Sequence, residues 1–321
     1  MVRILKNSLL SVIIAALIVI FIFGCQRGKR SIKSGPTVAF VMKTLNNPFF
    51  IDMQRGAKDA ADKYGINLLV QAAEREVDVE KQMQIIENLI QRQVDVICVT
   101  PSGSKEIIPA IVKANQANIP VIIVDTRVDA EALTESGGKT AGFIGSDNVD
   151  GGRIAGRYII EQLGGVGKVA ILEGIPGHET GDARMRGFHE ALTSQSGITL
   201  VASQTANWER DQGYNVFQNI LQSHSDVQAL FACNDMMALG AVEAISAMDK
   251  TDEIVVVGFD AITDGRQAIA KGRMSASIAQ HPYEMGKVAV EKAWALLQGQ
   301  NIPAEIPVKI ELITAASLKN N

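Results

Sequence analysis

The chain has 321 residues, 47% hydrophobic and 21% charged, which is typical of globular proteins and long enough for two domains with separate cores. Its formal net charge is −4, but all six charged residues among the first 35 are basic. The body from Pro36 onward therefore carries 25 basic and 35 acidic side chains. An acidic body argues against nucleic-acid binding, which needs a concentrated basic face. We expect no nucleic acid among its partners.

The N-terminal segment has the pattern of a targeting signal. Arg3 and Lys6 precede an uncharged apolar run from Leu9 to Gly24. This run is short for a membrane-spanning helix, which needs about 20 residues, but it suits the core of a signal peptide. The run ends in IFGC, which resembles a bacterial lipobox and implies cleavage before Cys25 and a lipid on the cysteine.

An uncleaved membrane anchor with an incidental cysteine is the alternative interpretation. The stretch QRGKRSIKSG, from Gln26 to Gly35, is interpreted as a flexible basic tether whose positive charges favour an anionic lipid surface. We therefore expect a signal peptide at residues 1–24 and a lipidated cysteine with its tether at 25–35. The folded body is expected to work outside the cytoplasmic membrane, in the periplasm or at the cell surface.

The body repeats short apolar runs rich in Val and Ile, each followed by a helical pattern. Such alternation indicates parallel sheets that are covered on both faces. The first half contains TVAFVM, INLLVQA, VDVICVT and IPVIIVD. The second half contains AGFIGSD, KVAILEG, ITLVASQ, VQALFACND, EIVVVGFD and SASIAQ. Because ten such strands exceed one comfortable sheet, we predict an α/β protein with two doubly wound lobes.

Two further features concern the division into lobes. The segment LTESGGKTAGF, Leu133–Phe143, is rich in Gly and polar residues and is the best candidate for the first crossing between lobes. Cys98 and Cys233 lie in predicted buried strands of different halves. We therefore expect both to be buried free thiols rather than a disulfide.

Polar residues follow several predicted strands at their carboxyl ends, where ligands bind in open parallel sheets. These residues are Lys43, Asp125, Asp147, Asn234, Asp260 and Gln280. Helix capping is the commonest use of Asp and Asn at such positions, and we assign Asp147 mainly to capping. The others are expected to face one another across a cleft lined with hydrogen-bond donors and acceptors.

No catalytic signature is present in the sequence. His178-Glu179 and His189-Glu190 each lack the second His of the HExxH zinc site, and neither GxSxG nor GxxxxGK occurs. No GxGxxG follows TVAFVM, and the loop at 147–151 lacks the side chains of a calcium site. We expect no enzymatic activity, no cofactor and no metal site.

Several segments together resemble periplasmic sugar-binding proteins of the ribose/allose-binding type. They are KTLNNPFF, ANQANIPVIIVD, SDNVDGGRIAGRYI, DVQALFACNDMMALGA, VVVGFD and SASIAQ, in order and with compatible spacing. The resemblance implies two Rossmann-like lobes of the type I fold, at 36–145 plus 281–309 and at 146–280 plus 310–321. Three hinge crossings would join the lobes, which close on one monosaccharide. The protein would act as a monomer and deliver the sugar to the permease of an ABC importer.

The resemblance, carried over by position, implies a ligand site drawn from both lobes. Its residues are Lys43, Asn47, Phe49, Phe50 and Asp125 in the first lobe, Arg184, Trp208, Asn234, Phe259 and Asp260 in the second, and Gln280 at a hinge. Carboxylates accept hydrogen bonds from sugar hydroxyls, and an Arg fork donates to vicinal oxygens. Aromatic faces cover the apolar faces of the sugar ring.

Departures from the ribose-binding pattern leave the identity of the sugar open. Thr126 follows Asp125 where those proteins have Arg, and Asp182 replaces a second Arg, for which Arg127 is a possible substitute. Lys43, the GDAR sequence and Trp208 look more like the allose-binding branch. The balanced charges suit a neutral polyol. A sensory protein that presents a sugar or furanosyl signal to a chemoreceptor or sensor kinase is the alternative to transport.

Overall fold

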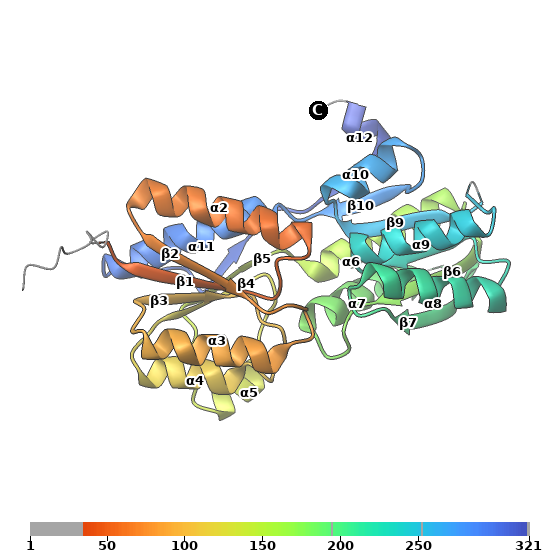
Figure 1. The fold of residues 1–321 in the computed structure, drawn as a ribbon. Helices are drawn as coiled ribbons and strands as arrows, with labels where there is room; N and C mark the ends of the chain where they lie inside the picture. Colours follow the sequence, from red (N-terminus) through yellow and green to blue (C-terminus); the bar gives the residue numbers. More distant parts are fainter. Residues whose placement is uncertain (1–34, 194, 252, 320–321) are drawn as a thin grey trace, which may run out of the picture. The chain divides into compact units, whose positions relative to one another are not determined.

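The computed structural model describes residues 35–193, 195–251 and 253–319. Within these ranges the chain forms twelve strands and eleven helices in two α/β lobes (Figure 1). The predicted signal peptide and lipidated Cys25 lie outside the described residues. No helix in the described ranges is both long enough and apolar enough to cross a membrane.

The first sheet is entirely parallel, with the strand order β11-β5-β4-β3-β1-β2. Its strands are β1 (Thr37–Met42), β2 (Asn67–Ala72), β3 (Val96–Val99), β4 (Val121–Val124), β5 (Gly142–Gly145) and β11 (Glu305–Pro307). Helices cover both faces (Figure 1): α2 (Pro48–Tyr64) and α11 (Pro282–Leu297) on one, and α3 (Val79–Gln91), α4 (Ile108–Gln116) and α5 (Ala130–Glu135) on the other. This double cover explains why the strands are continuous apolar runs.

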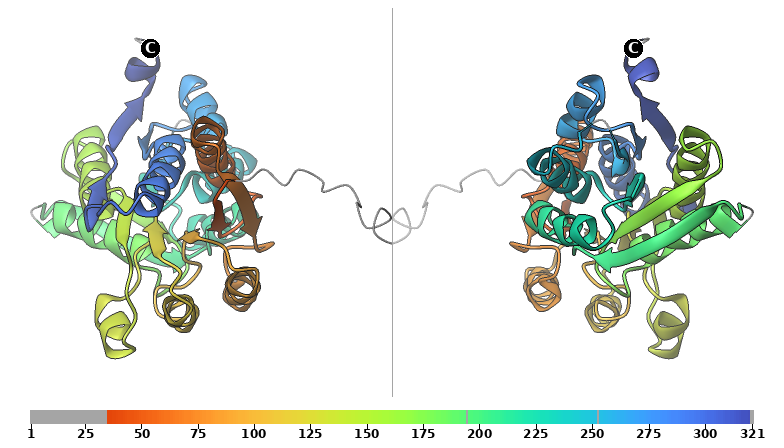
Figure 2. Two further views of the ribbon diagram at one scale, coloured as in Figure 1. Left: turned by 90° about the vertical axis from the view of Figure 1, so that its left-hand side faces the viewer. Right: turned by 90° about the vertical axis from the view of Figure 1, so that its right-hand side faces the viewer.

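The second sheet has the order β12-β10-β9-β8-β6-β7 and is parallel except for β12, which pairs antiparallel with β10. Its strands are β6 (Gly167–Glu173), β7 (Ile198–Thr205), β8 (Ala229–Ala232), β9 (Val255–Asp260), β10 (Ala276–Ala279) and β12 (Glu311–Thr314). Its helices are α6 (Asn148–Gln162), α7 (Glu179–Thr193), α8 (Arg210–Ser223), α9 (Asp235–Ala247), α10 (Thr263–Ala270) and α12 (Ala315–Lys319). Helix α6 packs against α7 and α8 packs against α9 (Figure 2).

Within the described ranges the chain passes between the two sheets three times, which confirms the predicted fold class. The crossings follow β5, β10 and β11. The prediction that the first crossing lies at Leu133–Phe143 is wrong, because that segment ends α5 and begins β5. Strand β5 pairs with β4 in the first sheet, so AGFIGSD belongs to the first half of the fold. An apolar strand has the same local pattern in either sheet, and only its pairing with a neighbouring strand shows to which sheet it belongs.

The two cysteines in the described ranges are free and buried, as predicted. Cys98 lies in β3 of the first sheet, and Cys233 follows β8 of the second. Burial raises the pKa of each thiol to about 12. Both therefore remain protonated thiols at neutral pH.

The start of α2 is held against α11 by two glycines. A Cβ at Gly56 would overlap the backbone oxygen of Tyr283, and one at Gly286 would overlap the backbone oxygen of Met53. The two helices therefore pack with their backbones in contact. This close packing fixes the first turn of α2, which carries Phe49 and Phe50, against the hinge crossing that precedes α11.

Candidate functional site

Residues at the carboxyl ends of strands from both sheets surround one cavity. Its lining residues are Lys43, Asn47, Phe49, Phe50, Glu76, Asp125, Thr180, Arg184, Trp208, Asn234, Asp260 and Gln280. The structure thus brings together every residue named for the site from the sequence except Phe259. Every lining residue is at most 8% exposed, so the site is shut off from solvent in this structure. The cavity suits a small polar molecule.

The first lobe contributes one ammonium group between two carboxylates. Lys43 follows β1, and its Nζ lies 3.7 Å from Oε2 of Glu76 and 4.0 Å from Oδ2 of Asp125. All three side chains are less than 10% exposed. Burial raises the pKa of Glu76, while Lys43 and a hydrogen bond from Asn47 act in the opposite direction. The charge of Lys43 is therefore balanced inside the protein.

Asn47 begins α2 and also faces the cavity. Its Oδ1 accepts a hydrogen bond from the backbone N–H of Phe49 at 3.0 Å, and Pro48 occupies the first turn. Its Nδ2 donates to Oε1 of Glu76 at 3.2 Å. The rings of Phe49 and Phe50 meet edge to face, with centroids 5.2 Å apart. Both rings are buried and both form cavity wall, so they belong to the core and to the site.

The second lobe holds Arg184, on α7, in a fixed orientation. Its Nε donates to Oδ1 of Asn148 at 2.9 Å, and its Nη1 donates to the backbone oxygen of Cys233 at 2.6 Å. Its Cζ lies 3.8 Å from the centroid of the Phe259 ring. Phe259 therefore packs against Arg184 and is not among the residues that line the cavity.

Asp260 ends β9 and lies between two partners. Its Oδ1 is 3.7 Å from Nη1 of Arg184 and accepts a hydrogen bond from Nε2 of Gln280 at 2.6 Å. Burial raises the pKa of Asp260 well above its usual range, and Arg184 acts against that rise. Gln280 precedes α11 at the second hinge crossing, so this hydrogen bond ties the carboxylate to the hinge.

A buried carboxylate behind the cavity shapes the backbone at Asp260. Asp235, at the start of α9, accepts hydrogen bonds from the backbone N–H of Ile262 at 2.9 Å and from the hydroxyl of Ser277 at 2.6 Å. The Ser277 hydroxyl oxygen in turn accepts from the N–H of Ala261. Asp260 and Ala261 have φ values of 104° and 50°, in the region that non-glycine residues rarely adopt. Asp235 therefore stabilises the strained turn that orients Asp260.

Trp208 and Asn234 form the remaining wall in the second lobe. Asn234 caps α9 by accepting from the N–H of Met237 at 2.8 Å, and its Nδ2 donates to the backbone oxygen of Trp208 at 3.1 Å. The Trp208 ring packs directly over Gly174, where a Cβ would overlap the ring. Glycine at this position therefore lets the indole approach the end of β6.

Two polar atoms of the lining have no hydrogen-bond partner in the described ranges. They are Nε1 of Trp208, a donor, and Oε1 of Gln280, an acceptor, and both are buried. A buried polar group without a partner costs about 1–3 kcal/mol. Because both residues line the cavity, a small molecule carrying acceptors and donors can satisfy them there.

Two lining residues were not predicted from the sequence, and Arg127, left open as a possible substitute for a missing Arg, does not line the cavity. Glu76 lies in the loop after β2, several residues beyond the end of the strand, whereas the polar residues predicted from strand ends lie at or close to those ends. Thr180 lies in the first turn of α7. Arg127 does not replace a missing Arg, because both its terminal nitrogens bond to Glu305 at 2.7 Å and its guanidinium covers Phe143. A charged residue anywhere in a strand-to-helix loop is a candidate for the site, and this wider criterion includes Glu76.

Direct hydrogen bonds join the lobes beside the cavity. The hydroxyl of Thr180 donates to that of Thr126 at 2.9 Å, and the backbone N–H of Glu179 donates to the hydroxyl of Ser104 at 3.1 Å. The first residue of each pair belongs to α7 of the second lobe, and the second belongs to a loop of the first. These contacts enclose the cavity from the side of α7. Asp147, assigned to capping from the sequence, does cap α6 by accepting from the N–H of Asp150.

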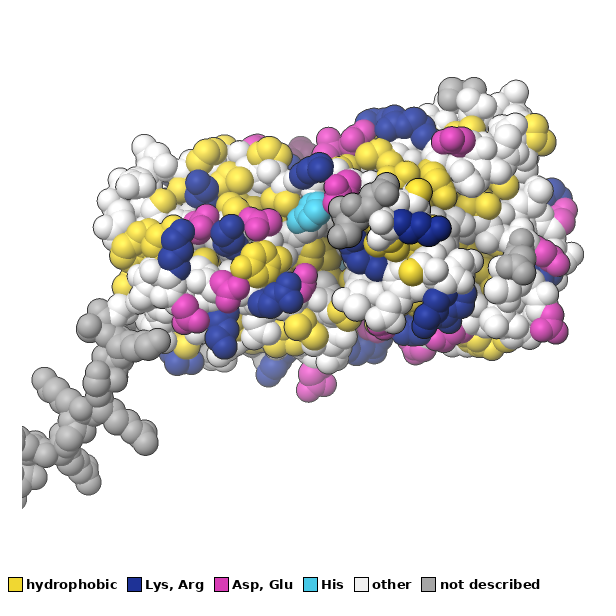
Figure 3. Space-filling view, turned by 90° about the horizontal axis from the view of Figure 1, so that it is seen from above, with side chains coloured by type: hydrophobic (Ala, Val, Ile, Leu, Met, Phe, Trp, Pro, Cys, Tyr) yellow, Lys and Arg dark blue, Asp and Glu magenta, His cyan; other side chains and the backbone are white. Residues whose placement is uncertain are grey.

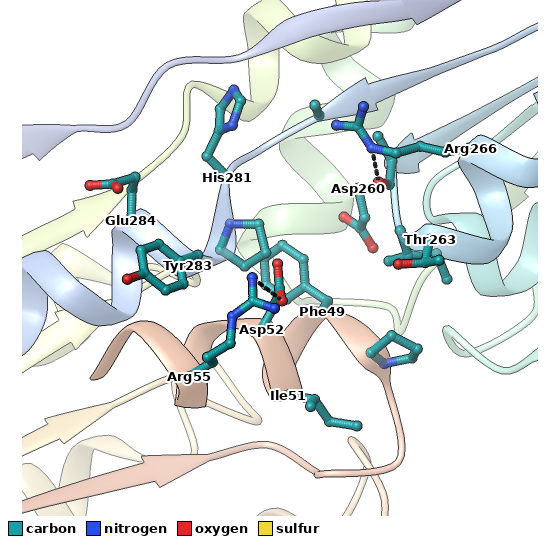
Figure 4. A pocket seen from close by; sticks show the side chains of 15 residues that line it. Phe49, Ile51, Asp52, Arg55, Asp260, Thr263, Arg266, His281, Tyr283 and Glu284 are labelled. Atoms are coloured by element: carbon teal, nitrogen blue, oxygen red, sulfur yellow. Dashed lines mark hydrogen bonds and ion pairs between the residues drawn. The ribbon is translucent and has the colours of Figure 1, made fainter. Parts of the chain in front are cut away.

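A wider groove adjoins the cavity and shares Phe49 and Asp260 with it (Figure 4). Its charged groups are largely paired: Asp52 lies 3.0 Å from Arg55, and Arg266 donates to the backbone oxygen of Ala261. On the face of the molecule that carries α2, α10 and α11, basic, acidic and hydrophobic side chains are interspersed (Figure 3). The groove is lined in part by exposed side chains such as Ile51, whereas every residue around the cavity is buried. The cavity is therefore the better candidate for a ligand site.

The chain matches known proteins over most of its length. The model of the periplasmic binding protein domain matches residues 38–301. The chain is 40% identical to the ribose import binding protein of Escherichia coli, over 86% of this chain and 90% of that protein. It is 34% identical to the D-allose-binding periplasmic protein of Escherichia coli, over 86% and 89%.

A solved structure of similar fold supports the same assignment. It is an ABC transporter periplasmic solute binding protein from Actinobacillus succinogenes with bound D-allose. The TM-score is 0.85 and the identity 39%, and the match covers 89% of this chain and all of that one. A family match of this extent, on two lobes that enclose a polar cavity, leads to one conclusion: the chain belongs to the periplasmic binding protein family.

Proposed function

We propose that this protein captures one neutral monosaccharide, of the ribose or allose kind, between its two lobes outside the cytoplasmic membrane and delivers it to the permease of an ABC importer. One observation carries the proposal. The enclosed cavity combines carboxylates, an ammonium, a guanidinium and aromatic rings, and includes an unpartnered donor on Trp208 and an unpartnered acceptor on Gln280. Sugar hydroxyls both donate and accept, and can therefore complete such a set.

The charges of the cavity favour a neutral ligand. Lys43 and Arg184 are matched by Asp125 and by the carboxyl groups of Glu76 and Asp260, whose pKa values burial raises. Among the described lining residues, no two cations lack carboxyl partners, so the cavity has no evident site for a phosphate group. The carboxyl groups are suited to accept from hydroxyls, and Arg184 to donate to sugar oxygens. Phe49, Phe50 and Trp208 would cover the apolar faces of the ring.

The similar proteins support a sugar ligand and a role in import. The relatives named above bind ribose or D-allose, and the similar solved structure contains D-allose. In this chain, the bodies proposed to close on the sugar are residues 36–145 with 281–309 and residues 146–280 with 310–321. The strand order of the two sheets supports this division, because β11 joins the first sheet and β12 the second.

The proposed function is binding without turnover, and calorimetry tests it directly. Titration of the purified protein with D-ribose, D-allose, D-glucose and myo-inositol should show saturable one-to-one binding of at least one of them. Inorganic phosphate and L-glutamate serve as anionic controls. Ligand recovered after incubation should give an unchanged NMR spectrum. Binding of an anion while no neutral sugar binds would contradict the proposal, and chemically altered sugar would contradict binding without turnover.

Membrane attachment through a lipid on Cys25 is the second part of the proposal, and it rests on the apolar run and the IFGC sequence alone. Cells that express the full chain should incorporate labelled palmitate into it and hold it in the membrane fraction. Cys25→Ser should lose the label. Equal labelling of the variant would contradict lipidation at Cys25. The protein is proposed to act as a monomer, which light scattering of the sugar-bound form tests.

A further inference from the structure

His178 is a buried histidine at the contact between the lobes, and the proposed sugar site does not use it. It lies in the turn between β6 and α7 of the second lobe and is only 4% exposed. Its imidazole forms a hydrogen bond with the backbone of Ser102, which belongs to the first lobe. Its Nδ1 has no hydrogen-bond partner in the described ranges. A protonated imidazole carries an N–H donor at both nitrogens, and this site pairs only one of them.

The residues that follow His178 also bind the first lobe. The N–H of Glu179 donates to Ser104, and the hydroxyl of Thr180 donates to Thr126. Thr180 is also a cavity-lining residue. The turn at 178–180 thus contacts the first lobe at three successive residues. All three contacts require the two lobes to be together, as they are in this structure.

We propose that His178 is a positioning residue for lobe closure, buried and neutral when the lobes meet around the ligand and open to protonation when they separate. This inference rests on the proposed function, because it concerns closure around the same ligand. Its consequence is that proton binding at His178 and sugar binding oppose each other. Closing the lobes on the sugar expels the proton from His178, and acid weakens sugar binding.

The environment of His178 explains the direction of this effect. Burial lowers the pKa of His178 to about 3, the nearby charge of Lys43 lowers it further, and the hydrogen bond with Ser102 acts against both. An exposed His has a pKa of about 6.5. The closed form therefore holds the proton less tightly than the open form. Affinity is at its full value above pH 6.5 and falls as the pH drops toward 3, by at most tenfold per pH unit for one proton.

Other titratable groups around the turn act in the opposite direction or pair with one another. Lys43 of the first lobe acts on His178 directly, and Lys43 itself lies beside Glu76 and Asp125. Next to His178 in the chain, Glu179 interacts with Arg127, Arg184 and Arg186, and Asp182 interacts with Arg186. Burial raises the pKa values of Glu76, Glu179 and Asp182. To the extent that closure of the lobes supplies this burial, protonation of these carboxyl groups favours closure as the pH falls. The contribution of His178 has to be isolated by comparison with a variant that cannot titrate.

The decisive experiment compares His178→Gln with the parent protein. The dissociation constant for D-allose, or for D-ribose if that binds more tightly, is measured by calorimetry at pH 7.5, 6.5 and 5.5. The factor by which the parent loses affinity between pH 7.5 and 5.5 should exceed that of His178→Gln by about tenfold. His189→Gln, which changes an exposed histidine on α7, should behave as the parent. Equal pH profiles for the parent and His178→Gln would overturn the inference.

Two further measurements separate this inference from folding and from the proposed function. The melting temperature at pH 7.5 establishes that His178→Gln folds, and His178→Asn is a second variant. NMR titration of the imidazole in sugar-free protein should give a pKa near 6.5, and a value near 3 would overturn the inference. This titration tests it even if neither sugar binds at pH 7.5, an outcome that would contradict the proposed function alone.

Discussion

The ammonium group of Lys43 lies 3.7 Å from the carboxylate of Glu76 inside the cavity, and both side chains are almost fully buried. Lys43 follows β1 directly, whereas Glu76 lies in the loop after β2. Strands β1 and β2 are neighbours in the first sheet, so their carboxyl ends meet. The pairing places opposite charges side by side next to the ligand site, and their attraction offsets part of the cost of burying them.

Glu76→Gln should lower both stability and sugar affinity. The substitution keeps the size of the side chain but leaves Lys43 with only Asp125, at 4.0 Å, as a charged partner. We expect a loss of about 1.5–3 kcal/mol in the free energy of unfolding, the range for a charged hydrogen-bonded group, and at least tenfold weaker binding. Urea denaturation and calorimetry measure the two effects. Glu80→Gln, on the exposed side of α3, is the matched control, and identical behaviour of both variants would refute the role of Glu76.

Arg184→Ala should destabilise the fold as well as abolish binding. The guanidinium satisfies the buried oxygens of Asn148 and Cys233 and covers the ring of Phe259. Removing one partner of such a buried network costs about 3–5 kcal/mol. Thermal denaturation should therefore show a clear fall in melting temperature. Arg186→Ala, an exposed position on the same helix, should melt like the parent. An unchanged melting temperature for Arg184→Ala would contradict this account.

Asp125→Asn should affect binding more than folding. Its Oδ2 accepts a hydrogen bond from Thr126 and faces Lys43 at 4.0 Å, and an amide of the same shape keeps the Thr126 contact. The amide accepts less strongly from sugar hydroxyls, so binding should weaken by about 1.5–3 kcal/mol, or roughly ten- to a hundredfold. Calorimetry with the preferred sugar checks this value. A variant that binds as tightly as the parent would remove Asp125 from the site.

Sugar binding should change the fluorescence of Trp208. The indole lines the cavity, and its unpartnered Nε1 would acquire an acceptor from the ligand. The second tryptophan, Trp294, stacks on Tyr64 between α2 and α11 and is not a lining residue. We therefore expect a saturable change in emission that Trp208→Phe abolishes and Trp294→Phe preserves. Loss of the signal in Trp294→Phe instead would place the ligand elsewhere.

Asp235 should make the protein more stable as the pH falls from about 7 to about 4. Burial raises its pKa to about 7, against the hydrogen bonds from Ser277 and Ile262. The folded state therefore binds the proton more tightly than the unfolded state. This contribution is fully present below pH 4 and is lost as the pH rises through 7, with a slope of at most about 1.4 kcal/mol per pH unit.

The variant Asp235→Asn should remove that slope. Urea denaturation at pH 4.5, 5.5, 6.5 and 7.5 gives the free energy of unfolding of the parent and the variant. The difference between them should shrink or change sign as the pH rises. Asp62→Asn, an exposed position on α2, should show a constant difference from the parent. A constant difference for Asp235→Asn would mean that the buried carboxyl titrates alike in the folded and unfolded states.

The sequence by itself determined the alternating strands and helices, the two-lobe fold and most of the residues around the cavity. The reason is local: apolar strands covered on both faces have a recognisable pattern, and polar residues such as Lys43 and Asp260 stand where those strands end. The caps at Asn47 and Asp147 were also predictable, since an Asx side chain bonds to the next turn of its own chain.

Only the tertiary structure decided to which sheet β5 belongs, which further residues line the cavity, and which contact the lining residues without lining it themselves. Strand pairing depends on the partner, and the same apolar run suits either sheet. Side-chain direction in a loop is fixed by distant contacts, so Glu76 joins the cavity while Arg127 turns away to Glu305. Phe259 packs against Arg184, and His178 bonds to the backbone of Ser102 in the other lobe. Both positions are set by packing between segments that the local sequence does not relate.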